Sequence, residues 1–193
     1  MILLTVAYVF NFVDRYILGL LVEPIKADLG LSDTQMGLLI GPAFAILYAA
    51  AGLPLGWLAD RMRRTLILGC GVALWSLATA ASSLARNFSQ LFLARVGVGV
   101  GEATLAPCAL SMISDSFPPE RRGRPIAFYT AAQSLGAGLA ALGGAAILGW
   151  ANSVDRLSLP MLGELKAWQF TFIVVGLPGL GVALLLFMTR EPA

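Results

Sequence analysis

A short basic stretch between two long apolar runs decides the fold, and it reads Gly56-Trp57-Leu58-Ala59-Asp60-Arg61-Met62-Arg63-Arg64. The apolar runs cover about 34–58 on one side and 66–85 on the other. Each run is long enough to cross the hydrocarbon core of a bilayer as a helix, which takes about 20 residues. The stretch therefore predicts a tight loop at the membrane surface between two spanning helices.

The composition of the whole chain agrees with a membrane protein. Of its 193 residues, 58% are hydrophobic and 12% are charged, and the mean hydropathy is +0.81. A soluble domain carries about 25% charged residues, so the composition argues against a water-soluble enzyme. The net charge of +2 is small and scattered, which argues against a nucleic-acid partner.

Working outward from the basic stretch, we find six apolar segments in all. Because they lack the period-two alternation of membrane strands, we expect an all-α polytopic membrane protein with six transmembrane helices. The connectors, at 23–33, 61–65, 86–87, 117–125 and 152–167, are expected to be polar loops. The predicted helices cover about 2–22, 34–58, 66–85, 89–114, 126–150 and 168–188.

The arginines predict the orientation, since cytoplasmic loops carry an excess of Lys and Arg. Outside the spans, seven Lys and Arg residues follow the even-numbered spans and four lie on the opposite side. We therefore expect both termini in the cytoplasm and an integral protein of the inner (plasma) membrane. The seven are Arg61, Arg63, Arg64, Arg121, Arg122, Arg124 and Arg190, and the four are Lys26, Arg86, Arg156 and Lys166, the last two near Asp155 and Glu164.

Glycines at four-residue spacing predict close helix packing, because small residues let helix backbones approach in lipid. Such pairs occur twice in the second span and once in the fourth. They are Gly37 and Gly41, Gly52 and Gly56, and Gly97 and Gly101.

Four ionisable residues fall inside predicted spans, and each costs about 2.5–3.5 kcal/mol near the bilayer centre. On a helix of 100° per residue, those of the first span share a sector of about 120°, and those of the fourth lie within about 20° of each other. A shared water-filled cavity and a purely structural ion-pair network are both consistent with this pattern. The first-span sector contains Tyr8, Asn11, Asp14 and Arg15, and the fourth-span pair is Arg95 and Glu102.

These charges suggest a chemistry for the cavity alternative. An arginine selects anions through its planar donor fork, and a neighbouring carboxyl group can take up a proton when an anionic substrate competes for the arginine. Our hypothesis is that Arg15 or Arg95 anchors the anion and that Asp14 or Glu102 carries the proton. The sequence has no histidine, which removes His-dependent hydrolases and His-containing zinc sites.

The two cysteines, Cys70 and Cys108, lie in separate apolar runs without a redox or metal-binding spacing. We therefore expect no enzyme, no cofactor and no metal site.

The basic stretch closely resembles the signature loop between the second and third helices of the major facilitator superfamily. It departs from that signature at Arg63, where the family has glycine, and at Thr65, where the family has a basic residue. The fourth span, 91–103, also matches a superfamily pattern, with Arg95 as the membrane arginine. Several stretches resemble the spinster-like branch, namely 11–15, 24–32, 97–103, 117–124 and 175–179.

The resemblance implies a secondary transporter and places Asp14, Arg15, Arg95 and Glu102 in its transport cavity. Known members of the branch carry lysophospholipids and sphingoid phosphates. Residues 1–193 would form the N-terminal six-helix half. A second half is then needed, either a C-terminal half absent from this sequence or a homodimer partner.

The resemblance further implies a cytoplasmic gate in the signature loop, formed by Gly56, Asp60, Arg61 and Arg64. Arg64 would pair with Asp115 and latch the cytoplasmic side when the cavity opens outward. In the alternative interpretation, the arginines only anchor the loop on anionic lipid, and both interpretations can hold together.

We therefore expect a proton-coupled transporter of an amphiphilic or organic anion, such as a lysophospholipid, with membrane lipids as its surroundings. The alternatives are a drug, organic-anion or sugar-phosphate exporter of the same superfamily, and a non-transporting membrane interaction protein. The last is favoured if changing the cavity charges leaves function intact.

Overall fold

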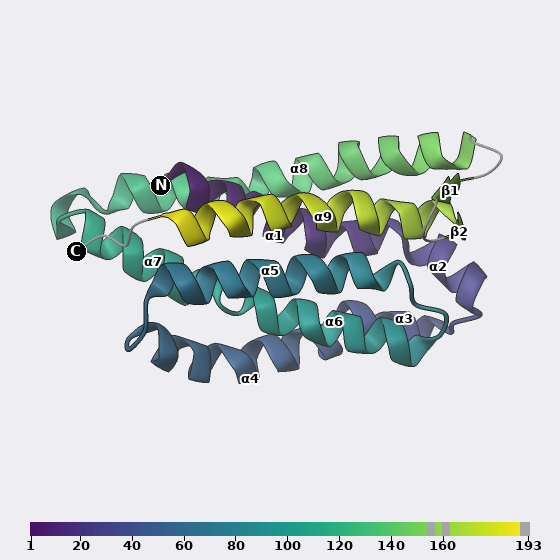
Figure 1. The fold of residues 1–193 in the computed structure, drawn as a ribbon, viewed down its shortest axis with the longest axis horizontal. Coiled ribbons are helices and arrows are strands. Elements are labelled where there is room, and N and C mark those ends of the chain that lie inside the picture. The colour runs from purple at the N-terminus through teal and green to yellow at the C-terminus, as the bar shows by residue number, and fades with distance from the viewer. Residues whose placement is uncertain (154–156, 160–162, 190–193) are drawn as a thin grey trace.

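The computed structural model of the chain describes residues 1–153, 157–159 and 163–189. Within these residues, six helical segments are long and apolar enough to cross a membrane. They run side by side along one long axis (Figure 1). The predicted all-α fold with six spans is therefore confirmed.

The described helices follow the predicted segments, with two of the spans divided in two. The bounds are α1 (Ile2–Leu20), α2 (Val22–Leu29), α3 (Asp33–Ile40), α4 (Pro42–Ala59), α5 (Arg64–Ser82), α6 (Phe88–Glu102), α7 (Leu105–Ser116), the 3₁₀ turn η1 (Pro119–Arg121), α8 (Gly123–Ser153) and α9 (Ala167–Met188).

The second and fourth spans are interrupted near prolines. Pro42 begins α4 directly after the break at Gly41. In the fourth span, Ala103 and Thr104 separate α6 from α7, and Pro107 cannot donate a hydrogen bond to the carbonyl of Ala103. The break leaves a buried glutamate, Glu102, as the last residue of α6.

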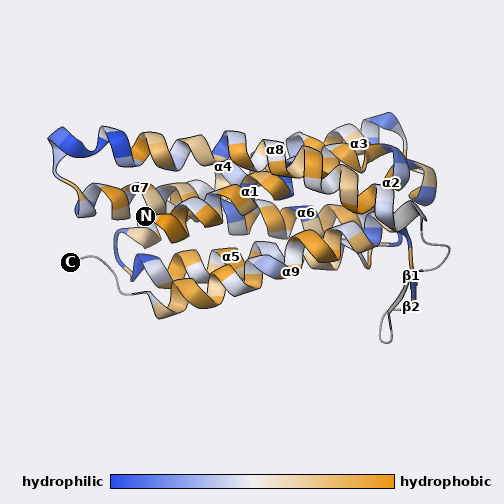
Figure 2. Ribbon diagram, turned by 90° about the horizontal axis from the view of Figure 1, so that it is seen from above, coloured by the Kyte–Doolittle hydropathy of each residue, from blue (hydrophilic) through white to orange (hydrophobic). Residues whose placement is uncertain are grey.

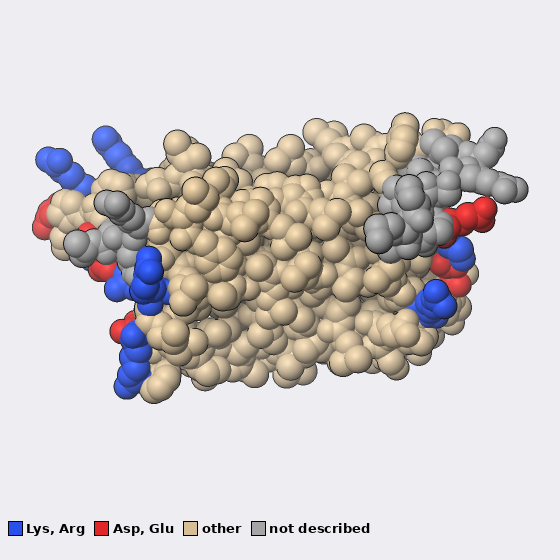
Figure 3. Space-filling model, viewed as in Figure 1, with Lys and Arg blue, Asp and Glu red and all other residues tan. Residues whose placement is uncertain are grey.

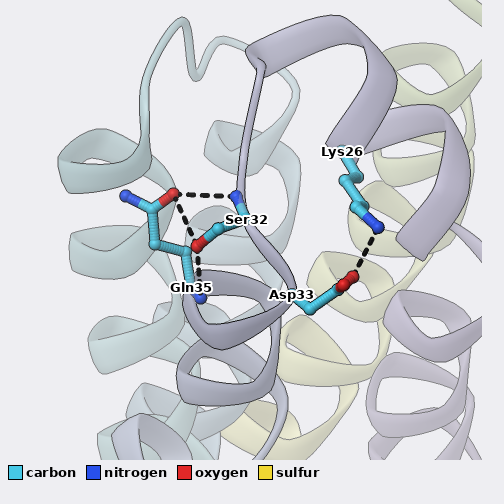
Figure 4. Close-up of polar contacts among 4 residues, drawn as sticks. All are labelled: Lys26, Ser32, Asp33 and Gln35. Carbon is cyan, nitrogen blue, oxygen red and sulfur yellow. Dashed lines mark hydrogen bonds and ion pairs between the residues drawn. The ribbon is translucent and has the colours of Figure 1, made fainter.

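The connector 23–33 differs from the polar loop that we expected, because α2 occupies most of it. The helix ends at Gly30, whose φ of 62° lies in the left-handed region that glycine adopts without strain. Ser32 then caps α3. Its side chain accepts from the backbone N–H of Gln35, whose side chain accepts from the backbone of Ser32 (Figure 4). Local capping chemistry thus builds a helical corner here.

The connector 152–167 also differs from expectation, since it contains a short antiparallel hairpin. Its strands are β1 (Leu157–Leu159) and β2 (Gly163–Leu165), paired with Leu157 opposite Leu165. Three charges that entered the orientation argument, Asp155, Arg156 and Arg190, lie outside the described residues.

The helices form layers, with α1 and α6 in the middle (Figures 1 and 2). On one side, α5 and α9 pack against each other and cover α6 and α1. On the other side, α8 packs against α1, and α4 packs against α6. The middle layer is therefore covered by other helices on both sides.

Charged side chains on the face shown in Figure 3 gather at the two ends of the bundle, and the band between them carries none. Helix α1 begins and α9 ends at the same end, where the basic α4–α5 and α7–α8 connections also lie (Figure 1). This distribution is that of an integral membrane protein. Which end faces the cytoplasm stays a prediction.

The expected glycine packing holds in the fourth span and fails in the second. A Cβ at Gly101 would lie 2.7 Å from the carbonyl oxygen of Gly71, and one at Gly97 would lie 3.0 Å from Ala78 Cβ, both on α5. At Gly37, Gly52 and Gly56, by contrast, a Cβ would meet nothing within 4 Å. The reason is that α4 lies at the margin of the bundle, where it is largely exposed.

Candidate functional site

The middle layer brings together the four charges predicted inside the spans. Asp14 and Arg15 are on α1, and Arg95 and Glu102 are on α6. Arg15 Nε donates a hydrogen bond to Glu102 Oε2 over 2.7 Å. Asp14 and Arg95 interact electrostatically with each other. Two acids and two arginines thus form one cluster with no net charge.

The four residues differ in their access to solvent. Glu102 is fully buried, and Asp14 and Arg95 are 2% exposed. The side chain of Arg15 is 30% exposed. Within the described part of the chain, the three buried residues fit the dry ion-pair alternative. Arg15 is the member of the cluster that a molecule outside the bundle can reach.

Several polar atoms of the cluster lack a hydrogen-bond partner among the described residues. They are Asp14 Oδ1, Arg95 Nε and Nη2, and Glu102 Oε1. A buried polar atom without a partner costs about 1–3 kcal/mol. The cluster is therefore neutral as a whole but incompletely paired: its carboxylate oxygens can accept a further proton or donor, and the Arg95 nitrogens can donate to a further acceptor.

Three aromatic rings surround the Arg15 guanidinium. Its Cζ atom lies 5.3 Å from the ring centre of Phe12, 4.7 Å from that of Phe44 and 4.9 Å from that of Tyr48. The last two rings come from α4. Cation–π contacts of this kind favour a fixed guanidinium position. The rings also place apolar surface directly beside the positive charge.

The other two predicted cavity residues lie on the same side of α1. Asn11 is buried, and its Nδ2 has no partner among the described residues. Tyr8 is half-buried and stacks on Tyr129 of α8, with ring centres 4.3 Å apart. Tyr8 thus connects α1 to α8, and Asn11 adds another unsatisfied donor near the cluster.

Some side chains beside the cluster were not predicted from the sequence. Thr79 of α5 is buried and lies beside the Asp14 carboxyl group, and Ser76, one turn away on α5, is buried as well. Their spacing of three residues in an apolar run was an available signal, since it places both on one helix face. The rings of Phe44 and Tyr48 carried no such signal, because aromatic residues are common in any membrane helix.

At the basic end of the bundle, the structure joins Arg64 Nη1 to Asp115 Oδ2 in an ion pair. This is the contact that the family resemblance implied. Asp60 is exposed at the end of α4, and the Arg61 guanidinium lies 3.7 Å from the ring centre of Trp57. The contact between α5 and α7 is therefore present, and its role as a gate stays a prediction.

The opposite end has a polar contact that was not predicted from the sequence. The carboxylate of Asp28 on α2 accepts from Lys166 Nζ and, over 2.8 Å, from the buried indole Nε1 of Trp168. Nearby, Lys26 and Asp33 form an ion pair (Figure 4). These contacts tie the corner formed by α2 to the start of α9.

Six apolar spans around a buried charge cluster define an integral membrane protein of the helical-bundle class. The chain belongs to the Major Facilitator Superfamily, whose sequence profile matches residues 4–193. The prediction made from the signature loop is thereby confirmed.

The relatives agree with this assignment. The probable L-galactonate transporter of Escherichia coli is 37% identical over 194 residues, which cover 99% of this chain and 39% of that protein. An MFS-type efflux pump of Mycolicibacterium smegmatis is 35% identical over 167 residues, covering 86% and 35%. Both are transporters by name, so the expectation that the chain is not an enzyme is confirmed.

A solved structure extends the likeness to three dimensions and to the spinster-like branch. It is an inward-facing, occupied bacterial homologue of the human lysosomal transporter Spinster. It superposes with a TM-score of 0.90 at 38% identity, covering 100% of this chain and 44% of that one. The chain thus spans less than half the length of these relatives.

Proposed function

We propose that the protein provides one half of a proton-coupled transporter of an organic anion, with Arg15 binding the anion and Glu102 carrying the proton. The observation that supports this most directly is the hydrogen bond from Arg15 Nε to buried Glu102, made by a guanidinium that is itself partly exposed. An accessible cation and a buried acid are thereby linked by one hydrogen bond.

Arg15 is the better anchor of the two arginines because it is accessible and Arg95 is buried. The contact with Glu102 uses Nε, so the terminal nitrogens keep donor capacity for a carboxylate or phosphate. The rings of Phe44 and Tyr48 border the same guanidinium. An anion with an apolar portion would therefore contact both charge and ring surface.

Glu102 is the better proton carrier because its partner is the anchor. When an anion draws Arg15 away, a fully buried carboxylate is left without its counter-charge, which is strongly unfavourable. Uptake of a proton removes that cost, so anion binding and protonation favour each other. Asp14, beside Arg95 and Thr79, is the second acid and would hold Arg95 in place.

The substrate class follows from the anchor and from the relatives. Those relatives include a probable L-galactonate transporter and a bacterial spinster homologue. Sugar acids and lysophospholipids share an anionic group that Arg15 can bind. We propose the amphiphilic anion as substrate, because three aromatic rings lie beside the charge.

Export of a drug-like organic molecule is the second candidate, favoured by the likeness to an efflux pump. A thermal-shift screen separates the candidates, since a ligand that binds the native state raises its apparent stability. Lysophospholipids, sugar acids, sugar phosphates and neutral drugs would be compared on the complete protein. Stabilisation by anions that disappears in Arg15→Gln supports the proposal, whereas stabilisation by neutral drugs alone supports export.

We further propose that the six spans pack against a second six-helix half, and that both ends of the chain lie in the cytoplasm. The excess of arginine at that end supports the orientation. The coverage of well under half of each relative supports the need for a second half.

The proposal is tested by pH-driven anion flux in proteoliposomes that contain the complete protein. Glu102→Gln is expected to abolish the response of flux to a pH gradient while anion exchange continues. Glu120→Gln, an exposed acid of η1, serves as the matched control. The assignment of Glu102 is wrong if Glu102→Gln leaves pH-driven flux unchanged, and proton coupling through this cluster is wrong if Asp14→Asn leaves it unchanged as well.

A further inference from the structure

A groove of about 260 Å³ runs between α4 and α5 at the basic end of the bundle. Its walls are Leu55 and Leu58 of α4 and Leu66, Cys70 and Leu74 of α5, and α6 closes its floor at Gly101. The groove is lined almost wholly by apolar atoms, and Leu66 and Leu74 are exposed. It lies apart from the Arg15 site.

The dimensions of the groove match one leaflet of a bilayer. From Leu66 to Leu74, helix α5 rises by about 12 Å, and half of the hydrocarbon core measures about 15 Å. The deep end reaches Gly101 and Thr104, at the break between α6 and α7. An extended acyl chain entering from the basic end would therefore fill the groove to near mid-membrane depth.

The mouth of the groove is cationic. Met62 lines it, and the exposed side chains of Arg61 and Arg63 flank Met62 in the sequence. Neither arginine forms an ion pair within the part of the chain that the structure describes, although the Arg61 guanidinium lies over the Trp57 ring. Arg63 is also the position where this chain departs from the glycine of the family signature.

The apolar groove and the arginines at its mouth together indicate a ligand with an apolar chain and an anionic headgroup. We propose that the groove binds an anionic phospholipid of the adjacent leaflet, with one acyl chain between α4 and α5 and the phosphate between Arg61 and Arg63. The phosphate then lies at the N-terminus of α5, where the helix dipole favours a negative charge. On the face shown in Figure 3, positive side chains gather at this end of the bundle, next to the uncharged band between the two ends.

Cys70 makes the proposal testable, because it is exposed in the groove wall whereas Cys108 is buried. The complete protein in detergent would be titrated with phosphatidylglycerol or phosphatidylcholine of identical acyl chains. The rate of N-ethylmaleimide addition to Cys70 is followed by peptide mass spectrometry. We expect protection of Cys70 at lower concentrations of phosphatidylglycerol than of phosphatidylcholine.

Two variants distinguish the contribution of the lipid headgroup to binding from that of the acyl chain. The pair Arg61→Gln and Arg63→Gln should raise the phosphatidylglycerol concentration for half-protection by about 25-fold, since each arginine near an anionic headgroup contributes about fivefold. The pair Arg121→Gln and Arg124→Gln removes the same charge from exposed positions elsewhere and should change nothing. Leu74→Trp, at an exposed position, should reduce retention of both lipids in native mass spectrometry.

Three results would overturn the proposal. They are equal protection by the two lipids, an equal effect of the control pair, and unchanged lipid retention in Leu74→Trp. The readouts do not depend on transport, so the lipid site and the proposed function can fail separately.

Discussion

Arg15 and Glu102 stand 87 positions apart in the sequence, yet Nε of the first donates to Oε2 of the second over 2.7 Å. The same glutamate keeps its other oxygen, Oε1, buried without a hydrogen-bond partner among the described residues. One contact therefore connects an accessible guanidinium to an acid that lacks part of its hydrogen bonding. Movement of the guanidinium away from Glu102 removes the counter-charge of that acid.

Replacing Arg15 tests the anchor. Arg15→Lys keeps the positive charge beside Glu102 but loses the planar donor fork. Because hydrogen bonds to charged groups contribute about 1.5–3 kcal/mol, we expect KM for the anion to rise about tenfold or more, with a smaller change in the maximal rate. Initial rates of uptake into proteoliposomes measure both. Arg124→Gln, at an exposed position, is the control, and an unchanged KM in Arg15→Lys would exclude Arg15 as the anchor.

Close packing of α5 on α6 predicts a stability effect at Gly71. A Cβ at this position would lie 2.0 Å from Thr104 Oγ1 and 2.8 Å from the carbonyl oxygen of Gly101. Since overpacking costs about 1–3 kcal/mol, Gly71→Ala should lower the midpoint of thermal unfolding. Gly138→Ala is the matched control, because a Cβ there meets nothing within 4 Å and alanine favours a helix. Equal midpoints for the two variants would contradict the packing that we describe.

The positions of the spans could be predicted because length and apolar composition determine which segments cross a bilayer. The breaks within the second and fourth spans were harder to predict, since Gly41 and Ala103 lie within continuous apolar runs. Only the nearby prolines indicate that the helix is interrupted. The helix α2 was missed because Pro24 and three charges made its segment resemble a loop. Tertiary packing and the Gly30 and Ser32 termini decide its conformation.

The composition of the charge cluster could be predicted in the same way, but its pairing could not. Helical periodicity shows that Asp14 and Arg15 share one sector of α1. It does not show which of them faces Glu102 across the interface, because that depends on the rotation and depth of α6 relative to α1. The difference in exposure between Arg15 and Arg95 arises from the same packing, and it determines which arginine can meet a substrate.

The ion pair between Lys26 and Asp33, at the corner formed by α2 and α3, predicts a pH-dependent reactivity. Lys26 and Lys166 are the two lysines of the sequence. The hydrogen bond and charge of Asp33 raise the pKa of Lys26 above its ordinary value. A raised lysine pKa means that the ion pair is fully present below the ordinary value, about 10.4, and is lost as pH rises through the higher value. Asp33→Asn should therefore increase the fraction of neutral Lys26 at alkaline pH.

Amine labelling at pH 9 measures this change, because only the neutral amine reacts. Peptide mass spectrometry should show faster modification of Lys26 in Asp33→Asn than in the parent protein. Lys166, which pairs with Asp28, is the internal reference and should keep its rate. A parallel increase at both lysines would point to general opening of this end instead of loss of one ion pair.

The ion pair between Arg64 and Asp115 predicts a modest and reversible effect on the conformational equilibrium. The pair joins α5 to α7 at the basic end, and its side chains are 23% and 40% exposed. A partly exposed pair contributes about 1 kcal/mol or less, and a like-charge pair costs a similar amount, so Asp115→Arg should shift the population toward the state open at this end by about 30-fold at most. Arg64→Asp should do the same, and the double exchange should restore the original balance, because opposite charges again face each other.

The labelling rate of a cysteine introduced at Ser116, beside the pair, reports the opening. If the double exchange is as open as either single variant, the pair does not hold this end closed, and the arginines of the loop act only on lipid and topology.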